Sequence, residues 1–266
     1  MDHLVFEANP WWLIIVLTIV LSLAIELPYR FRSFMPAIVG KNLDALGAVQ
    51  AGLLTLASFV LGLSFSQAQG RFDARRELVV KEANTIGTTW LRADQLRTPQ
   101  EQQFRKLLVD YTATRLHAYQ FPDSSEFERQ RSYQVQLSRS SRDQDEMWAI
   151  VSPALRARPE DNGLSLLMQA LNKTIDVSGE QLQALTTHIP TAVVALTLAL
   201  IALGALSLGL RFAAHGVRPA ALSAVYVVAS VIVVTMMIDY DRPERGFVNV
   251  DLKPLQIQLQ TMQPTR

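Results

Sequence analysis

Cysteine is absent from this chain of 266 residues, and charged residues are scarce. Without cysteine there is no disulfide, no thiolate nucleophile and no cysteine-ligated metal. Charged residues make up 18% of the chain, whereas typical soluble domains have about 25%. The formal net charge of +1 argues against a nucleic-acid partner, because nucleic-acid binding needs a strongly basic surface.

Recognisable catalytic and metal-binding motifs are also lacking. The four histidines are scattered, and none stands at metal-ligand spacing from another histidine or a carboxylate. No glycine-rich phosphate loop, nucleophile elbow or HExxH motif occurs. The sequence therefore predicts neither an enzyme nor a resident cofactor, apart from a calcium ion considered below.

What the chain does have is four long segments almost free of charge, at residues 11–27, 46–69, 189–210 and 219–238. Each has about 17 to 25 residues, the length that an α-helix needs to cross the hydrocarbon of a bilayer. Backbone groups in lipid must be satisfied internally, and these segments lack the alternation of barrel strands. The sequence predicts an all-α integral membrane protein with four transmembrane helices.

The long segment between spans two and three predicts an extramembrane helical bundle. No proline interrupts residues 46–97, so span two should continue as one helix of about 50 residues, roughly 75 Å long. Thr98 and Ser125 begin the next two helix-start patterns, and the second of these helices should end near Ser152, before Pro153.

These expectations divide the chain into four parts. Residues 1–69 hold the first two spans, residues 70–188 the extramembrane bundle, residues 189–240 the last two spans, and residues 241–266 a C-terminal tail. With four spans, the bundle and both termini lie on one side. The two short loops are basic, so the positive-inside rule puts them in the cytoplasm and the bundle outside.

Small and polar residues follow one face of span two. At 100° per residue they fall within about 80° of one another. The set also contains a small-xxx-small packing pattern. The face therefore indicates either helix packing or a water-lined path, and its members are Ala51, Thr55, Ser58, Gly62, Ser66, Gln69, Asp73 and Arg76. Ser64 and Gln67 lie off this face and need other partners, or bond back to helix carbonyls.

Acidic residues end the fourth span. Asp239 stands at the edge of the hydrocarbon, where an ionisable group is costly and usually paired. A structural ion pair is the first interpretation, with Asp241 and Arg242 as surroundings and Arg75 or Arg76 of the second span on the same membrane side. The alternative is a calcium site formed by Asp239, Asp241 and Glu244, because calcium prefers oxygen ligands.

Three segments carry an uncommon pattern: Arg71–Arg75 (RFDAR), Glu82–Asp94 (EANTIGTTWLRAD) and Asp241–Gly246 (DRPERG). They resemble a family of bacterial membrane proteins described as having a bestrophin-like domain. The layout of that family matches the chain from the first span to Gly246. The resemblance implies four spans in the bacterial cytoplasmic (inner) membrane.

The stretch Ser58–Gly62 (SFVLG) is similar to a Ser-Phe-x-Leu-Gly stretch in the pore-neck helix of the bestrophin channels themselves. Those channels are pentameric, conduct anions, and have an extended second helix, a cytosolic large domain and a calcium-sensing acidic segment. Aligned on Gly62, their hydrophobic neck residues correspond to Thr55, Phe59 and Leu63. Only Phe59 is aromatic here, and Thr55 and Ser66 lie between the neck face and the small, polar face.

Together these observations predict a homo-oligomeric ion channel, a pentamer by resemblance, that conducts inorganic anions such as chloride through a pore lined by span two. Arg71, Arg75 and Arg76 would concentrate anions at the pore mouth. The alternative is a non-conducting oligomeric scaffold or accessory protein, surrounded by membrane lipid, whose bundle binds a partner. In that case the face at Ser58, Gly62 and Gln69 serves packing alone.

Overall fold

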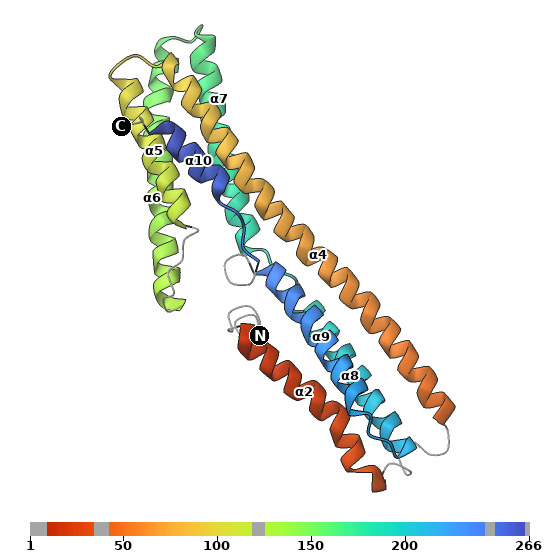
Figure 1. Cartoon of the computed structure of the whole chain (residues 1–266). Helices are drawn as coiled ribbons and strands as arrows, with labels where there is room; N and C mark the ends of the chain where they lie inside the picture. Colours follow the sequence, from red (N-terminus) through yellow and green to blue (C-terminus); the bar gives the residue numbers. More distant parts are fainter. Residues whose placement is uncertain (1–9, 35–42, 119–125, 243–247, 264–266) are drawn as a thin grey trace. The chain divides into compact units, whose positions relative to one another are not determined.

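The computed structural model describes residues 10–34, 43–118, 126–242 and 248–263, and within them every regular element is a helix. Four helices of this part are long and apolar enough to span a membrane. The predicted all-α membrane fold is therefore confirmed. The elements in chain order (Figure 1) are α2 (Pro10–Arg30), η1 (Arg32–Phe34), α4 (Leu43–Arg92), η2 (Ala93–Gln95), α5 (Gln100–Ala118), α6 (Glu126–Ala157), α7 (Asn162–Thr186), α8 (Thr191–His215), α9 (Ala220–Asp241) and α10 (Lys253–Met262).

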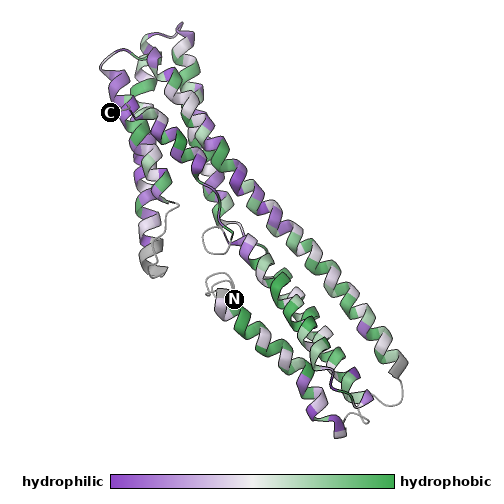
Figure 2. Cartoon of the chain, viewed as in Figure 1, coloured by the Kyte–Doolittle hydropathy of each residue, from purple (hydrophilic) through white to green (hydrophobic). Residues whose placement is uncertain are grey.

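The chain divides into two compact units. The span unit comprises Met1–Phe72 and His188–Val248, and the bundle unit comprises Asp73–Thr187 and Asn249–Arg266. Helix α4 contributes to both, and α10, which the sequence suggested only as part of a tail, belongs to the bundle unit. Most of α2, α8 and α9 is hydrophobic, whereas the bundle helices mix hydrophobic and hydrophilic residues (Figure 2).

Small residues allow close helix packing in the span unit. Helix α2 packs against α8 and α9, and a Cβ atom on Gly209 of α8 would lie 2.4 Å from the carbonyl oxygen of Ile25. A Cβ atom on Gly204 would lie 2.8 Å from the Tyr226 hydroxyl of α9. At Gly209 only glycine fits, because backbone atoms of α2 are in the way, whereas at Gly204 side chains would have to move; small residues of this kind are typical of membrane helix interfaces.

The bundle unit has a conventional apolar core. Val79 and Ile86 of α4, together with Phe104 and Leu108 of α5, are almost fully buried in one cluster. Gly87 of α4 faces α10, because a Cβ atom there would lie 2.9 Å from the side-chain oxygen of Gln258. The bundle thus builds a hydrophobic core within a single chain.

Helix boundaries follow the sequence with one exception. Helix α4 has 50 residues, as predicted, and α5 and α6 begin within two residues of Thr98 and Ser125. The prediction that α6 ends near Ser152 is wrong, since the helix continues through Pro153 to Ala157. Val151 and Ala154 are buried on either side of the proline, so core packing there outweighs the loss of one helix hydrogen bond.

Candidate functional site

Helix α4 has two distinct faces in the span unit. Ala57, Ser64 and Ala68 are buried against the rest of the unit. On the opposite side, Phe59 is 63% exposed and Leu63 is 50% exposed. Every candidate pore or packing residue lies on this exposed face, namely Thr55, Ser58, Phe59, Gly62, Leu63, Ser66 and Gln69.

The serine side chains on the two faces of α4 differ in their hydrogen bonds. The Ser64 hydroxyl donates to the Val60 carbonyl at 2.8 Å and lies 3.4 Å from the Thr197 hydroxyl of α8. Ser64 therefore bonds back to its own helix, as predicted. Within the described part of the chain, the side chains of Ser58 and Ser66 show no such hydrogen bond. On the same exposed face, the Thr55 hydroxyl does bond back to the Ala51 carbonyl at 2.9 Å.

The glycine in this face is not required by packing within the chain. A Cβ atom on Gly62 would meet nothing within 4 Å, in contrast to Gly204 and Gly209, where a Cβ atom would clash. Any need for a small residue at Gly62 must therefore come from something outside the single chain: another copy, lipid or a permeating solute.

A buried carboxylate joins three elements at one end of the span unit. Asp241 is fully buried, and its carboxylate accepts a hydrogen bond from the Ile189 backbone N–H at 2.9 Å. The Arg71 guanidinium of α4 lies 3.5 Å away, and the His188 ring lies 3.6 Å away. The interpretation of an ion pair at the end of span four is supported for Asp241, with Arg71 as a partner on α4 that the sequence analysis did not name for this pair.

Aromatic packing holds the same region together. The Tyr240 ring stands edge-on to Phe65 at 5.6 Å and to Phe72 at 5.4 Å between ring centroids. Both phenylalanines belong to α4, so Tyr240 attaches the end of α9 to two turns of that helix. The sequence analysis did not single out these rings, because nothing in the local pattern pairs residues that are so far apart in the chain.

The three arginines assigned to a pore mouth do not act as one group. The Arg71 guanidinium lies 3.5 Å from the Asp241 carboxylate. Arg75 is buried, and its guanidinium donates to the carbonyls of Ala184 and Thr187, each at 3.0 Å. These carbonyls lie at the carboxyl end of α7, where unsatisfied acceptors attract a cation. Of the three, only Arg76 is exposed, which corrects the predicted set.

Hydrogen-bond donors lie next to the carboxylates of Asp239 and Asp241. The Asp239 carboxylate accepts from the Val248 backbone N–H at 3.1 Å, and the Asp241 carboxylate faces donors on three sides. Among the described residues, no group of three or more histidine and acidic side chains could hold a metal ion. Glu244, the third predicted ligand, lies outside the described residues. The calcium site stays a prediction that these contacts do not support.

The segment Glu82–Asp94 contains a buried charge pair that the sequence analysis missed. Glu82 is fully buried, and the Arg115 Nε of α5 donates to its carboxylate at 2.7 Å. Arg115 also contacts the side-chain oxygen of Gln181 on α7. Burial raises the pKa of the nearby Tyr111 hydroxyl. The one sequence signal was a glutamate between the apolar residues Val79, Ala83 and Ile86 of α4; its partner, 33 residues away, had none.

Comparison with solved structures identifies the fold. A crystal structure of a bacterial bestrophin homologue from Klebsiella pneumoniae matches with a TM-score of 0.60 and 15% identity, over 94% of each chain. A variant of that homologue matches with a TM-score of 0.65 and 17% identity, over 96% of each chain. No curated protein matches the chain. The molecule is therefore a four-span membrane protein with the bestrophin fold.

The family follows from the sequence itself. The model of the Bestrophin-like domain matches residues 17–255, which is most of the chain. The protein belongs to the bestrophin-like domain family, and the predicted resemblance is confirmed. Membership of this family supports a channel kind of function.

Proposed function

We propose that this protein is a subunit of a homo-oligomeric anion channel, with chloride as a permeant ion and α4 lining the pore. The observation that carries the proposal is the exposed face of α4, where Phe59 and Leu63 stand uncovered beside Ser58, Gly62 and Ser66. Membership of the bestrophin-like family supports the same assignment.

The mixed chemistry of this face suits a pore better than lipid. Hydroxyl groups without partners are costly in hydrocarbon, and water or another subunit would supply partners for Ser58 and Ser66. Phe59 and Leu63 are large and apolar, and a ring of such side chains closes a pore by dewetting. Repeated around an axis, α4 would supply a hydrophobic constriction and, next to it, a small face for subunit packing.

The decisive measurement is current through the purified protein in a planar bilayer under a chloride salt gradient. A reversal potential near that of chloride supports the proposal, whereas one near that of the cation would contradict anion conduction. Phe59→Ala should raise basal conductance, because it widens the constriction. The matched control is Val228→Ala on α9, because Val228 is also large and exposed. Equal currents in wild type and Phe59→Ala would contradict a gate at Phe59.

A scaffold remains the second candidate, because Ser58, Gly62 and Ser66 also form an exposed packing pattern. The number of subunits distinguishes the two: about five copies around an axis favour a pore, whereas a dimer does not. Native mass spectrometry of the detergent-purified protein would count them. An intact oligomer that stays electrically silent across pH and calcium would favour the scaffold.

For localisation we propose the bacterial inner membrane, with the bundle unit in the cytoplasm as in the bestrophin channels and against the loop-charge count. The absence of cysteine makes this testable by labelling single introduced cysteines with a membrane-impermeant maleimide. Lys106→Cys in the bundle unit and Val217→Cys in the loop before α9 are both exposed positions. Labelling of Lys106→Cys, but not of Val217→Cys, in spheroplasts with intact membranes would reverse the proposed orientation.

A further inference from the structure

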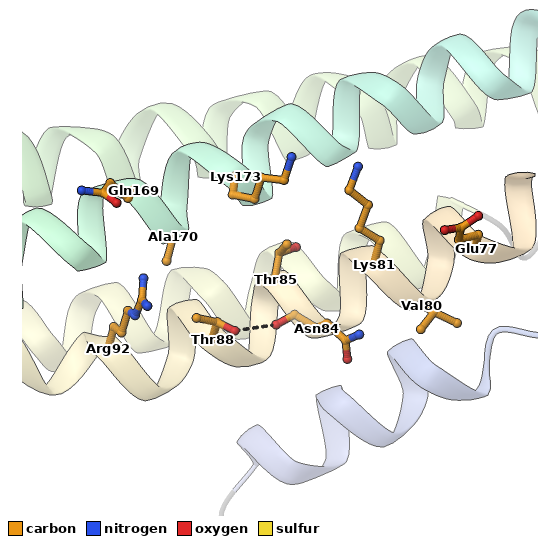
Figure 3. Close-up of a pocket in the computed structure, with 10 residues that line it drawn as sticks. All are labelled: Glu77, Val80, Lys81, Asn84, Thr85, Thr88, Arg92, Gln169, Ala170 and Lys173. Atoms are coloured by element: carbon orange, nitrogen blue, oxygen red, sulfur yellow. Dashed lines mark hydrogen bonds between the residues drawn. The ribbon is translucent and has the colours of Figure 1, made fainter.

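Helices α4 and α7 form a groove within the bundle unit (Figure 3). Its volume is about 520 Å³, within the range of about 300–1,000 Å³ typical of small-molecule sites. All of its lining residues belong to the bundle unit, so the groove is separate from the exposed α4 face proposed as the pore.

Cationic side chains enter the groove from both walls. Lys81 and Arg92 come from α4, and Lys173 comes from α7. Figure 3 shows Lys81 and Lys173 reaching toward one another from the two helices. Among the described lining residues, Glu77 is the one carboxylate, so the groove has an excess of positive charge.

The two lysines already contact a carboxylate of the chain itself, that of Glu180, which is not among the lining residues. The Lys81 amino group lies 2.5 Å from one Glu180 oxygen, and the Lys173 amino group lies 4.0 Å from the other. The hydrogen bond from Lys81 lowers the pKa of Glu180. The two lysines are therefore placed so that they converge on a single oxyanion.

The rest of the groove can bind a polar body. At the far end, the Arg92 guanidinium is oriented by a hydrogen bond of 2.8 Å to the Leu166 carbonyl. In the middle, the Thr85 and Thr88 hydroxyls donate to carbonyls of their own helix. Their remaining lone pairs can accept hydrogen bonds from a ligand, and the carboxamide of Asn84 can donate or accept.

We propose that this groove binds a small polar molecule that carries a phosphate or carboxylate group. The oxyanion lies on Lys81 and Lys173, where it replaces the Glu180 carboxylate, and the polar body lies along Thr85 and Thr88. Charge-assisted hydrogen bonds of lysine and arginine recognise both kinds of oxyanion. Ion conduction does not require this site, so its test is independent of the channel.

The test is calorimetric titration of the full-length protein in detergent. The probes are inorganic phosphate, glycerol 3-phosphate and succinate, each matched in ionic strength with sodium chloride. Saturable binding of the phosphate probes alone, or of succinate alone, identifies which oxyanion the groove selects. No saturable heat with any probe up to about 10 mM would overturn the proposal.

Single substitutions test whether the probe binds at the two lysines of the groove. Lys81→Gln and Lys173→Gln should each weaken it by about tenfold, because each removes a charged hydrogen bond. Glu180→Gln should tighten it by several fold, because the internal competitor is lost. The control is Lys106→Gln, the same change at an exposed lysine of α5; a loss there equal to that of Lys81→Gln would reduce the effect to general electrostatics and overturn the site. Thermal unfolding without ligand checks that every variant is folded.

Discussion

The two halves of α4 belong to one continuous helix but depend on different surroundings. In the bundle unit, Val79, Glu82 and Ile86 are buried by helices of the same chain. In the span unit, the apolar window of α4 is only 11% buried, against 44% for α8. The difference teaches that the bundle completes its fold within one chain, whereas the span half of α4 presents a face that lipid, water or another copy must cover.

The largest expected effect tests whether the bundle half is self-sufficient. Glu82→Leu should lower the free energy of unfolding by about 3–5 kcal/mol, because Arg115 is left as an uncompensated buried charge. The double variant Glu82→Leu with Arg115→Met should recover most of that loss. Chemical unfolding of the detergent-purified protein measures both, and Glu77→Leu at an exposed position of α4 is the control. If the double variant is as unstable as the single one, the loss of stability does not come from the unpaired charge of Arg115.

The next effect contrasts two glycines in the span unit. Gly209→Ala should destabilise the protein by about 1–3 kcal/mol or more, because the new methyl group clashes with the backbone of α2. Gly62→Ala should leave the stability of the single chain unchanged, since open space surrounds that position.

Gly62 should instead matter for assembly. Gly62→Leu is expected to change the size of the oligomer in native mass spectrometry, because the small-xxx-small pattern no longer permits close approach. An unaltered oligomer would place Gly62 away from any subunit interface and toward the pore or lipid.

A smaller effect is expected in α6 of the bundle unit. Burial raises the pKa of Asp143, and one oxygen of its carboxylate is buried with no hydrogen-bond partner among the described residues. The folded state therefore holds the proton more tightly than the unfolded state. This stabilisation is present below the usual aspartate pKa and is lost as the pH rises through the raised value.

Asp143→Asn should consequently raise the unfolding temperature at pH 7 modestly, by less than about 1 kcal/mol in free energy. The advantage should vanish below about pH 3, where aspartate is mostly protonated in both states. Thermal unfolding as a function of pH measures it. A variant that is less stable than wild type at pH 7 would contradict this assignment.

The smallest expected effect concerns the exposed arginine at the boundary between the two halves of α4. Arg76→Gln should lower chloride conductance by about twofold at low salt and less at high salt, because exposed charges are screened. Arg156→Gln, a change at an exposed position of α6, should have no effect on current. Equal reductions of the conductance in both variants would contradict a role of Arg76 at the pore mouth.

Much of the fold could be predicted because lipid imposes a simple rule on the sequence. Four uncharged segments of sufficient length predicted α2, α4, α8 and α9, and the proline-free stretch predicted the length of α4. The site was harder. Thr55, Phe59 and Leu63 could be placed on a helix face by periodicity, yet periodicity cannot distinguish a face that meets its own chain from one that does not.

By itself the sequence determined the membrane class, the helical architecture and the family, because hydrophobic length and local motifs are properties of neighbouring residues. Only the tertiary structure decided which charges meet. Arg71 lies near Asp241, Arg75 binds the end of α7, and Glu82 pairs with Arg115. A buried charge pairs with an opposite charge that helix packing places within a few ångströms. The distance between two residues along the chain does not show which residue that is.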